Sequence, residues 1–581
     1  MQRQKYTILT LVALTVMLLS ACVPATAPAA GGGATAENAA DSNATASNDG
    51  KVLRIDLGTF PDIVDPQKSS FVNEIANLQM MYEGLTKLDA NLETVPGSAE
   101  SWSYNDDSTQ LTFTLRDGLK YSDGSVLNAA RFAYSIQRNI DPATAGEYAA
   151  ITDEIAGAPE WRGCGDDAGA CEDAKNTVMQ SVMASHADGA ECSGYDDEAC
   201  NTLTLTLSRP APYFHTVSSL WVTFPAKQEN IEAGGETWWL DPQYQIGNGP
   251  FVLTAMEQGV SSAYAPNPNY YGGTAHTSID FSYINDSAVR FEAYKNDELD
   301  VISLGAEDLE VVMADADLSA QLMRYSGSCT FAIMFHQLKE PFTDQNVREA
   351  FAYALDRGAW VQDVLRGIGS PTLTWIPKGF PGYDAEENRW GYDPEKAKAA
   401  LAESSYANVE SLPAITATFG DTPRNRTRWE WLVAKWKEVL GVDIALDPVE
   451  PTTFTALTKD ISTAPQMFLL GWCADYPDPQ NWLSVYWKTG AFGERIGYSN
   501  PDLDALLEKA DVEGDPATRA QLYADAQRML TDSAPVAFMW NNENTWLVKP
   551  WVTGVTTTSM DQYPGSYLSL ELDVDTSKLP Q

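Results

Sequence analysis

The sequence predicts a mixed α/β protein built as two lobes or three domains. Its 581 residues are too many for one ordinary hydrophobic core, although 44% of them are hydrophobic, the usual share for a globular protein. Segments with the alternation of half-buried strands and segments with the spacing of amphipathic helices follow one another along the chain, without repeats. Together, the length and these two periodicities favour an α/β architecture divided into lobes.

The N-terminus has the pattern of a lipoprotein export signal. Basic residues Arg3 and Lys5 precede an apolar stretch from Ile8 to Leu19, and small residues then precede Cys22. Such a signal is cleaved so that the cysteine becomes a lipid-bearing N-terminus. We therefore expect residues 1–22 to be a signal peptide that ends at a lipidated Cys22. An ordinary signal peptide with an incidental cysteine is the alternative.

Residues 23–50 consist mostly of Ala, Gly, Thr, Ser and Asn. Such a segment has almost nothing to bury and is predicted to be a flexible tether. The folded body should begin near Lys51, and no later apolar segment approaches the length of a membrane span.

Acidic residues outnumber basic ones, with 80 Asp and Glu against 38 Lys and Arg. A surface of this charge repels nucleic acid and anionic ligands and attracts cations at long range. Nucleic acid is therefore excluded as a partner, while most of the acidic residues are expected simply to be solvated.

Once Cys22 is assigned to lipid, six cysteines remain. An even number in an exported protein is expected to be paired. Two disulfides between cysteines that are close in sequence would cross-link a polar segment rich in Asp and Gly, residues 164–200, which we call the excursion. The two remaining cysteines would then pair with each other. The resulting pairs are Cys164 with Cys171, Cys192 with Cys200, and Cys329 with Cys473. Other pairings within the excursion stay open.

Five segments are predicted to be strands. The first three of the following segments have alternating or short apolar patterns, and the last two are continuous apolar runs: Leu53–Leu57, Gln110–Arg116, Asn201–Leu207, Met467–Leu470 and Ala534–Trp540.

Five segments are predicted to be helices. The first three of the following segments are amphipathic, and the last two have a proline in the first turn: Val72–Tyr82, Asn346–Leu365, Arg428–Leu440, Pro394–Ala402 and Pro516–Leu530.

The stretch Gly471–Trp482 follows a predicted buried strand and places Asp475 beside an indole and a thiol. Pro477 and Pro479 are expected to exclude regular structure after it. A carboxylate in such crowded surroundings is poorly solvated, so it must be hydrogen-bonded internally or receive a cation. A turn-capping Asp is the alternative.

No catalytic motif is found. The sequence lacks a Gly-x-Ser-x-Gly elbow, a His-Glu-x-x-His pair and a phosphate-binding glycine loop, and its four histidines stand far apart. Asp475 and Asp478 could in principle serve a glycosidase, but their proline-locked neighbours disfavour this reading. The acids of the excursion do not fit the EF-hand spacing, which leaves calcium binding there as a minor alternative. We expect no enzyme, no cofactor and no metal site.

The stretch Leu111–Gly124 resembles the signature region of the family 5 extracellular solute-binding proteins, which are peptide, oligopeptide and nickel receptors of ABC importers. Further segments are similar to family landmarks in the same order: Gly247–Phe251, Asn267–Tyr271, Pro341–Ala350 and Leu547–Trp551. The resemblance spans nearly everything from Lys51 onward.

This resemblance implies a two-lobed periplasmic-binding-protein-like fold of type II, in its large three-domain form, with a ligand cleft between the lobes. By position, three segments would form the main domain of lobe 1: 51–97, 220–327 and 541–581. Residues 98–219 would be its second domain, with the Cys-stapled insertion, and residues 328–540 would be lobe 2.

The stretch Gly471–Tyr476 most resembles the oligopeptide-binding members, in which an Asp holds the α-ammonium group of the peptide. The resemblance implies this role for Asp475 and a disulfide between Cys329 and Cys473. The ligand-binding candidates are Asp475, Trp472, Cys473, Tyr476 and Trp540. Trp482 also lies near segments expected to face the cleft.

At one position the sequence departs from the pattern of the peptide-binding members, and that position concerns the carboxylate end of the ligand. Some peptide receptors carry an Arg two residues before the glycine of this motif, where it meets the ligand carboxylate, but here that residue is Leu469. Arg366 or Lys459 could take its place.

The function implied is that of a monomeric, lipid-anchored substrate-binding protein at the outer face of the cell membrane or in the periplasmic space. It would capture peptides in a closing cleft and deliver them to the permease subunits of an ABC importer. An oligosaccharide or another small solute is the alternative ligand, because the 17 tryptophans offer platforms for sugar rings.

Overall fold

The computed structural model describes residues 51–165 and 168–580. The predicted signal peptide with its lipidated Cys22 and the tether 23–50 lie outside the described residues. Within the described part, no helix combines the length and the apolar character needed to cross a membrane.

The main sheet is mixed and has eleven strands in the order β15-β14-β16-β12-β17-β11-β1-β10-β9-β8, with β13 paired to β17. Their bounds are β1 (Val52–Asp56), β8 (Phe251–Glu257), β9 (Ser261–Pro266), β10 (Ser278–Ser282), β11 (Val301–Ser303), β12 (Leu322–Phe335), β13 (Ser370–Pro371), β14 (Ile415–Gly420), β15 (Ile444–Val449), β16 (Met467–Cys473) and β17 (Val536–Val548). Parallel pairs join β1 to β10 and β11, and β14 to β15 and β16.

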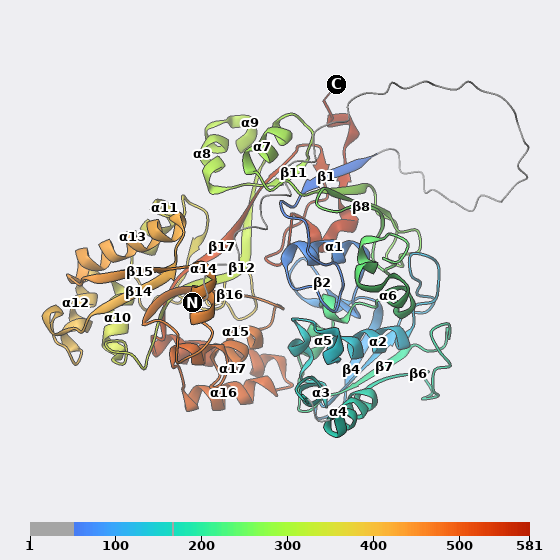
Figure 1. Ribbon diagram of the computed structural model, residues 1–581, viewed down its shortest axis with the longest axis horizontal. Coiled ribbons are helices and arrows are strands. Elements are labelled where there is room, and N and C mark those ends of the chain that lie inside the picture. Colours follow the sequence, from blue (N-terminus) through green and yellow to red (C-terminus); the bar gives the residue numbers. More distant parts are fainter. Residues whose placement is uncertain (1–50, 166–167, 581) are drawn as a thin grey trace, which may run out of the picture. The chain divides into compact units, whose positions relative to one another are not determined.

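Two long strands lie at the centre of this sheet. The antiparallel pair β12 and β17 runs from Leu322 opposite Leu547 to Met334 opposite Val536, with a register shift between Ser326 and Thr330. Figure 1 shows the two strands side by side, running from the end of the sheet that holds β1 and β11 to the end that holds β14 and β15. These strands therefore carry the chain twice between the two ends of the sheet.

A separate four-stranded antiparallel sheet has the order β4 (Ala99–Tyr104), β5 (Gln110–Leu115), β7 (Thr202–Thr206) and β6 (Val182–Ser185). Along β5, Leu111, Phe113 and Leu115 are buried while the residues between them are more exposed, which gives the strand its alternation. The shorter strand pairs are β2 (Thr86–Leu88) with β3 (Thr94–Pro96), and β18 (Val552–Thr553) with β19 (Asp573–Val574).

The helices of the first part of the chain are α1 (Val72–Met81), α2 (Ala129–Ile140), α3 (Ala158–Arg162), α4 (Ala168–Ser181), α5 (Phe214–Val217), α6 (Gln228–Gly234), α7 (Ser287–Lys295), α8 (Ala306–Ala314) and α9 (Ala316–Ser319). Asn128 begins α2 by accepting a hydrogen bond from the backbone N–H of Arg131.

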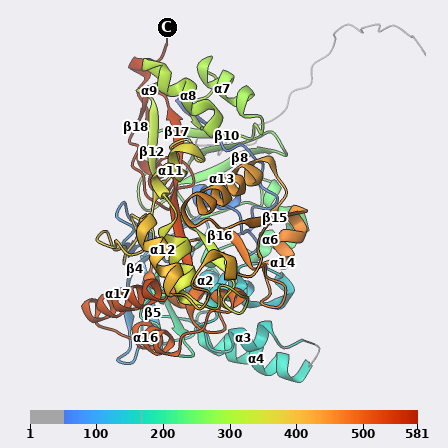
Figure 2. The same cartoon turned by 90° about the vertical axis from the view of Figure 1, so that its left-hand side faces the viewer.

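The helices between β12 and β17 are α10 (Gln345–Tyr353), α11 (Arg357–Asp363), α12 (Pro394–Glu403), α13 (Pro423–Leu440), α14 (Pro451–Leu457), α15 (Pro479–Trp487), α16 (Pro501–Asp511) and α17 (Pro516–Asp532). Figure 2 faces this group, with α11 and α13 above α12 in the view and α16 and α17 below it. Ile333 and Phe335 of β12 belong to a core with α10 and α13, while Ala332 and Met334 belong to a core with α15, α16 and α17. The sheet is thus buried on both faces here.

Three element predictions need correction. The helix expected over Asn346–Leu365 is two helices, α10 and α11, because Asp356 accepts a hydrogen bond from the N–H of Ala359 and starts a second helix. Pro479 does not exclude regular structure but begins α15, with Asp478 as its N-cap. The helix expected from Arg428 begins earlier, at Pro423, where the side chain of Thr422 caps it.

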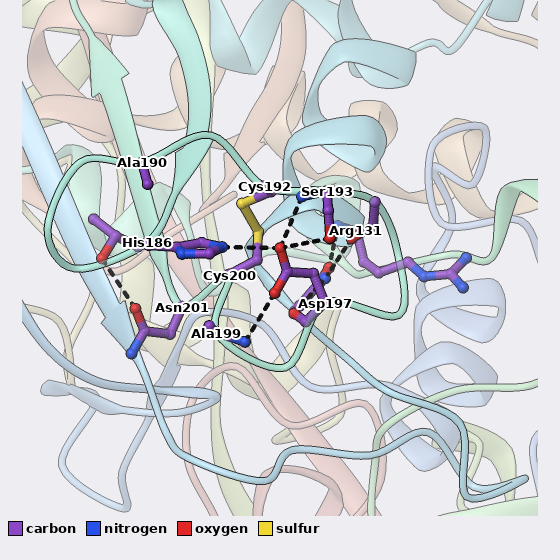
Figure 3. The surroundings of a disulfide bond; sticks show 12 residues. Arg131, His186, Ala190, Cys192, Ser193, Asp197, Ala199, Cys200 and Asn201 are labelled. Carbon is purple, nitrogen blue, oxygen red and sulfur yellow. Dashed lines mark hydrogen bonds and ion pairs between the residues drawn. A yellow bond between two sulfur atoms is a disulfide. The ribbon is translucent and has the colours of Figure 1, made fainter.

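All three disulfides considered above are present, joining Cys164 to Cys171, Cys192 to Cys200 and Cys329 to Cys473. Figure 3 shows the surroundings of the second. There Asp197 accepts hydrogen bonds from the N–H and Oγ of Ser193 and from the N–H of Ala199, and its Oδ2 lies 2.8 Å from Nε2 of His186. These bonds, led by the backbone N–H of Ser193, lower the pKa of the Asp197 carboxyl. The carboxylate thus organises the loop that the disulfide closes.

Candidate functional site

The candidate site lies where β16 ends. Cys473, the last residue of the strand, stands opposite Cys329 of β12, and the disulfide joins the two residues directly across the strand pair. The backbone N–H of Ala474 still donates to the carbonyl of Ser328, at 2.9 Å. The strand therefore holds the chain up to the residue before Asp475, longer than the Met467–Leu470 run expected from the sequence.

One edge of β16 is largely without a strand partner. β12 pairs with β16 from Met467 to Cys473, whereas the described strand on the other side, β14, pairs with it at a single position, Ala417 with Met467. The backbone of Leu469–Cys473 consequently has a sheet partner on its β12 side alone, as far as the described residues go. Such an edge can hydrogen-bond an added extended chain.

The Asp475 carboxylate is held by two neutral donors. The side-chain amide of Asn481 donates to Oδ2 at 3.0 Å, and the hydroxyl of Tyr148 donates to Oδ1 at 3.3 Å. The Asn481 carbonyl oxygen in turn accepts from the backbone N–H of Asp475 and from Nε1 of Trp472. In the described part of the chain no Lys, Arg or His forms an ion pair with Asp475. Hydrogen bonds therefore fix the position of the Asp475 carboxylate, but no cation among the described residues neutralises its charge.

Burial raises the pKa of the Asp475 carboxyl, and the hydrogen bonds from Asn481 and Tyr148 pull it back toward its usual range. A carboxylate held this way favours a cation beside it, since an opposite charge would restore what desolvation removes. The sequence analysis expected a carboxylate that is either hydrogen-bonded internally or able to receive a cation. Asp475 satisfies both conditions, because it is hydrogen-bonded internally and still lacks a cation.

A cavity of about 360 Å³ opens beside Asp475. Aromatic side chains form much of its wall, and acidic and small residues complete it: Tyr148, Tyr213, Trp472, Tyr476 and Phe492, with Glu147, Asp153, Glu154, Asp475, Gln480, Asn481, Ala150, Ile151, Val217 and Val485. The set contains no Lys, Arg or His. The residues come from 147–217 and from 472–492, so two distant parts of the sequence share the cavity.

Two of the lining carboxylates already have cations. Asp153 forms an ion pair with Arg162, and Glu154 accepts from Nε of Arg209 at 2.8 Å and from the hydroxyl of Tyr213 at 2.6 Å. Glu147 and Asp475 remain as the acids of the cavity without a cationic partner among residues 51–165 and 168–580. The cavity therefore presents net negative charge to whatever enters it.

Asp478, three residues after Asp475, has a structural role. Its side chain caps α15 at the N–H of Gln480, and both of its oxygens accept from Arg519 at 2.8 Å. Its carboxylate is consequently committed to Arg519, and the pair Asp475 and Asp478 is not a pair of free carboxylates of the kind a glycosidase uses.

The other candidates lie at different distances from this cavity. Trp472 packs against Tyr486 and Phe492 and lines the wall, while Tyr476 is buried with its ring parallel to that of Tyr213, 6.4 Å away. Cys473 is held in the disulfide, next to the wall.

The remaining candidates lie elsewhere. Trp540 is 4% exposed, stacks on Phe331 and lines a second cavity together with Arg366. Lys459 lines a third cavity. Trp482 is fully buried in the core around α15, on the helix that Pro479 begins.

Sequence reasoning missed Tyr148, Glu147 and Asn481. Asn481 lies within the singled-out stretch and could have been found as a polar residue in the first turn of a helix begun by Pro479. No local signal marks Tyr148, since 327 positions separate it from Asp475. Across the described residues, no group of three or more His, Cys, Asp or Glu side chains is arranged to hold a metal ion.

Comparisons with known proteins give a consistent result. The family model described as bacterial extracellular solute-binding proteins, family 5 Middle, matches residues 93–494. The oligopeptide-binding protein OppA of Bacillus subtilis is 26% identical over 569 residues, covering 95% of this chain and 97% of the relative. The periplasmic murein peptide-binding protein MppA of Escherichia coli is 27% identical over 502 residues, covering 85% and 88%.

Among solved structures, the unliganded open form of the MppA periplasmic murein tripeptide binding protein superposes with a TM-score of 0.76 at 25% identity. The match covers 90% of this chain and 97% of that one. The two-lobed α/β fold expected from the sequence is thereby confirmed, whereas the division into domains at particular residues stays a prediction.

Proposed function

The chain belongs to family 5 of the bacterial extracellular solute-binding proteins, and from this premise we propose that it is the peptide receptor of an ABC importer. The proposal assigns it a binding role and no catalytic step. Its relatives named for oligopeptides and murein peptides support a peptide as the ligand class.

The observation that carries the proposal is the uncompensated Asp475 carboxylate at the cavity wall. Two neutral donors hold it in place, so a ligand ammonium can approach it without displacing another cation. An ammonium and a carboxylate that are desolvated together stabilise each other, while either alone in a closed cleft is unfavourable. We assign Asp475 as the anchor for the α-ammonium group of the peptide.

The partly unpaired edge of β16 offers a second means of holding a peptide. An extended ligand could lie along Leu469–Cys473 and exchange main-chain hydrogen bonds with it. Main-chain bonds are independent of the ligand's side chains, so they would give affinity without fixing a sequence. Trp472 and Tyr476 would then flank the first residue of the ligand.

The cellular part of the proposal rests on the sequence. We propose that Cys22 carries lipid, that residues 23–50 tether a monomeric body to the outer face of the cell membrane, and that the closed receptor delivers its ligand to permease subunits. The acidic composition supports a protein that binds no nucleic acid.

An oligosaccharide is the competing ligand, and the aromatic walls of the cavity favour it. A neutral sugar would leave Asp475 and Glu147 without a cation, however, so the charge of the cavity favours the peptide.

The test uses an enzymatic digest of casein and, separately, a mixture of neutral oligosaccharides. Purified protein is incubated with each, washed and released, and the captured molecules are identified by mass spectrometry. We expect peptides to be captured unchanged, and N-acetylation of the digest to prevent capture. Retention of a neutral sugar in preference to peptides would overturn the proposal.

Asp475→Asn keeps the shape of the side chain and removes its charge. Loss of one partner of a desolvated ion pair costs about 3 to 5 kcal/mol, so affinity should fall by several hundredfold or more. Acetylating the peptide should weaken the wild type strongly and the variant little, as measured by calorimetry. Equal affinities of the two proteins for the free peptide would return Asp475 to a turn-capping role.

A further inference from the structure

The cavity beside Asp475 has more room than the α-ammonium group of a ligand needs. Its volume is about 360 Å³, whereas an ammonium group is about the size of a water molecule, which occupies about 30 Å³ in the liquid. In a peptide anchored as proposed, the side chain of the first residue leaves the same carbon atom as the ammonium group. That side chain therefore starts beside Asp475 and has the rest of the cavity available to it.

One wall of this cavity comes from residues 147–154 and carries three carboxylates. Asp153 and Glu154 are neutralised by Arg162 and Arg209. Glu147 is exposed, and the described residues place no cation within ion-pair distance of it. A ligand side chain that enters the cavity therefore meets one acid on this wall whose charge is not yet compensated.

The negative charge of Glu147 acts on the same hydroxyl that holds Asp475. Burial is the main cause that raises the pKa of the Tyr148 hydroxyl, and the charges of Asp475 and Glu147 raise that pKa further. The Tyr148 hydroxyl also donates to Asp475, at 3.3 Å. The charge of Glu147 thus reaches the part of the cavity where the ligand ammonium is expected, and both carboxylates favour positive charge there.

The cations around the cavity do not offset this charge. The residues that line it, all within the described part of the chain, include no Lys, Arg or His. Arg519 is committed to Asp478, and Arg495, whose guanidinium carbon lies 5.2 Å from the centre of the Phe492 ring, lines a different cavity. An acidic side chain of a ligand would consequently find no partner in the wall, and burying it unpaired would be costly.

The aromatic wall suits the stem of a long basic side chain. Trp472 and Tyr148 line the cavity and are half-buried, so part of each side chain remains accessible. Lys and Arg side chains pack their methylene groups on apolar surface while the charged end stays in polar surroundings, and aromatic ring faces attract cations. The cavity thus has a place for both parts of such a side chain.

We propose that Glu147 is a specificity-determining residue, which makes the receptor prefer peptides whose first residue is Lys or Arg and disfavour peptides that begin with Asp or Glu. Asp475 holds the α-ammonium group, which every peptide with a free N-terminus has, whereas Glu147 receives the side-chain cation, which only some peptides have. This inference rests on the proposed function, since it takes the ligand to be a peptide anchored at Asp475.

The alternative is that Glu147 is a solvated acid that no ligand contacts. A double-mutant cycle between the first side chain of the ligand and Glu147 separates the two possibilities. Such a cycle measures the interaction between the two groups and cancels the effect that each change has alone.

The experiment begins with capture from a casein digest made with a protease of broad specificity. Mass spectrometry compares the first residues of the captured peptides with those of the whole digest. One captured peptide, whose length is then known to fit, is resynthesised with Lys, norleucine or Glu as its first residue and with its α-amino group free or acetylated. Norleucine keeps the aliphatic stem of Lys and lacks the charge. Calorimetry measures the affinity of each version.

Four proteins are compared, namely the wild type, Glu147→Gln, Glu147→Lys and the control Glu160→Gln. Glu160 is an exposed acid of α3 that does not line the cavity, so its variant removes the same charge without altering the wall. Because Glu147 is exposed, neither of its variants should destabilise the fold.

We expect the wild type and Glu160→Gln to bind the Lys version about two- to fivefold more tightly than the norleucine version, as for an ion pair that is partly open to solvent. The Glu version should bind more weakly than both. In Glu147→Gln the ratio of the Lys and norleucine affinities should fall to near one, and Glu147→Lys should bind the Lys version more weakly than the norleucine version.

Two kinds of contrary outcome are distinguishable. If the wild type binds the three free peptides equally while acetylation prevents binding, or if the preference for Lys is unchanged in both Glu147 variants, the assignment of Glu147 is wrong and the proposed function stands. If no peptide is captured, or if acetylation alters no affinity, the proposed function fails and the assignment fails with it.

Discussion

Two carboxylates three residues apart have different fates in this molecule. Asp478 forms a two-pronged ion pair with Arg519 and caps α15, whereas Asp475 has two neutral donors and faces a cavity. The difference comes from Arg519, on another helix, and from Tyr148, hundreds of residues earlier. The sequence could therefore single out the stretch but could not assign the roles of its two acids.

The raised pKa of Asp475 predicts a pH dependence with a definite sign. Ligand ammonium requires the ionised carboxylate, so peptide affinity should fall as the pH is lowered through the folded-state pKa. In the unliganded protein the folded state holds this proton more tightly than the unfolded chain, whose Asp pKa is about 3.9. The stability due to this group is thus present below about pH 4 and lost as the pH rises through the folded pKa. Calorimetric titrations across pH should show the change in affinity, and Asp475→Asn should remove it. A wild-type affinity that is flat over this range would contradict the assignment.

Asp478→Asn should destabilise the fold without removing the α15 cap, because the amide oxygen can still accept from Gln480. The ion pair with Arg519 is largely buried, with side-chain exposures of 12% and 14%. Removing one charge leaves the other poorly solvated and should cost about 2 to 4 kcal/mol. Urea unfolding measures this loss. Asp460→Asn, at an exposed turn, is the control and should change stability by under about 0.5 kcal/mol. Equal midpoints for the two variants would show that the ion pair does not stabilise the fold.

At the scale of the elements, each of the five segments expected to be strands overlaps a strand, and three of the five expected helices lie close to their observed bounds. The alternation in Gln110–Arg116 and the proline at Pro516 mark β5 and α17 almost at their observed bounds. Pairing partners, in contrast, are set by contacts far along the chain. The extension of β16 to Cys473 depends on β12, 144 residues away at the disulfide, and no local pattern contains that information.

The Cys329–Cys473 disulfide should affect both stability and binding. It closes a loop of 144 residues, for which chain entropy predicts about 5 kcal/mol. It also fixes the strand end that positions Asp475. We expect Cys329→Ala with Cys473→Ala to lower the free energy of unfolding by about 2 to 5 kcal/mol and to weaken peptide binding.

The matched control removes Cys164 and Cys171, whose disulfide lies outside the residues that line either cavity. That double variant should keep its peptide affinity in calorimetry. If both double variants bind peptide as tightly as the wild type, the Cys329–Cys473 disulfide is not needed to position the end of β16 for binding.

At the scale of the whole molecule, the chain crosses the main sheet twice through β12 and β17 and returns residues 541–580 to the region where residues 51–97 lie. The sequence could predict more than one lobe from length alone. The sequence could not predict that β12 and β17 each run through the main sheet from one end to the other, because one long strand and two short strands have the same local pattern. The resemblance supplied the lobes, and the cavity shared by residues 147–217 and 472–492 agrees with a ligand held between distant parts of the chain.

The proposed lipid anchor can be tested on the whole chain. Cys22→Ala should prevent lipidation, so the protein should move from the membrane fraction to the soluble fraction while its peptide affinity is unchanged. Cell fractionation followed by immunoblotting measures the shift. A variant that stays with the membranes would show that Cys22 is not the anchor.

The disulfide across β12 and β16 also has a consequence for timing. A chain made in the reducing cytoplasm lacks this bond, and the strand end beside Asp475 is then held by hydrogen bonds alone. Under the proposed export, oxidation outside the cytoplasm would form the disulfide. If the chain is exported as proposed, its peptide affinity should therefore be lower before the bond forms than after it.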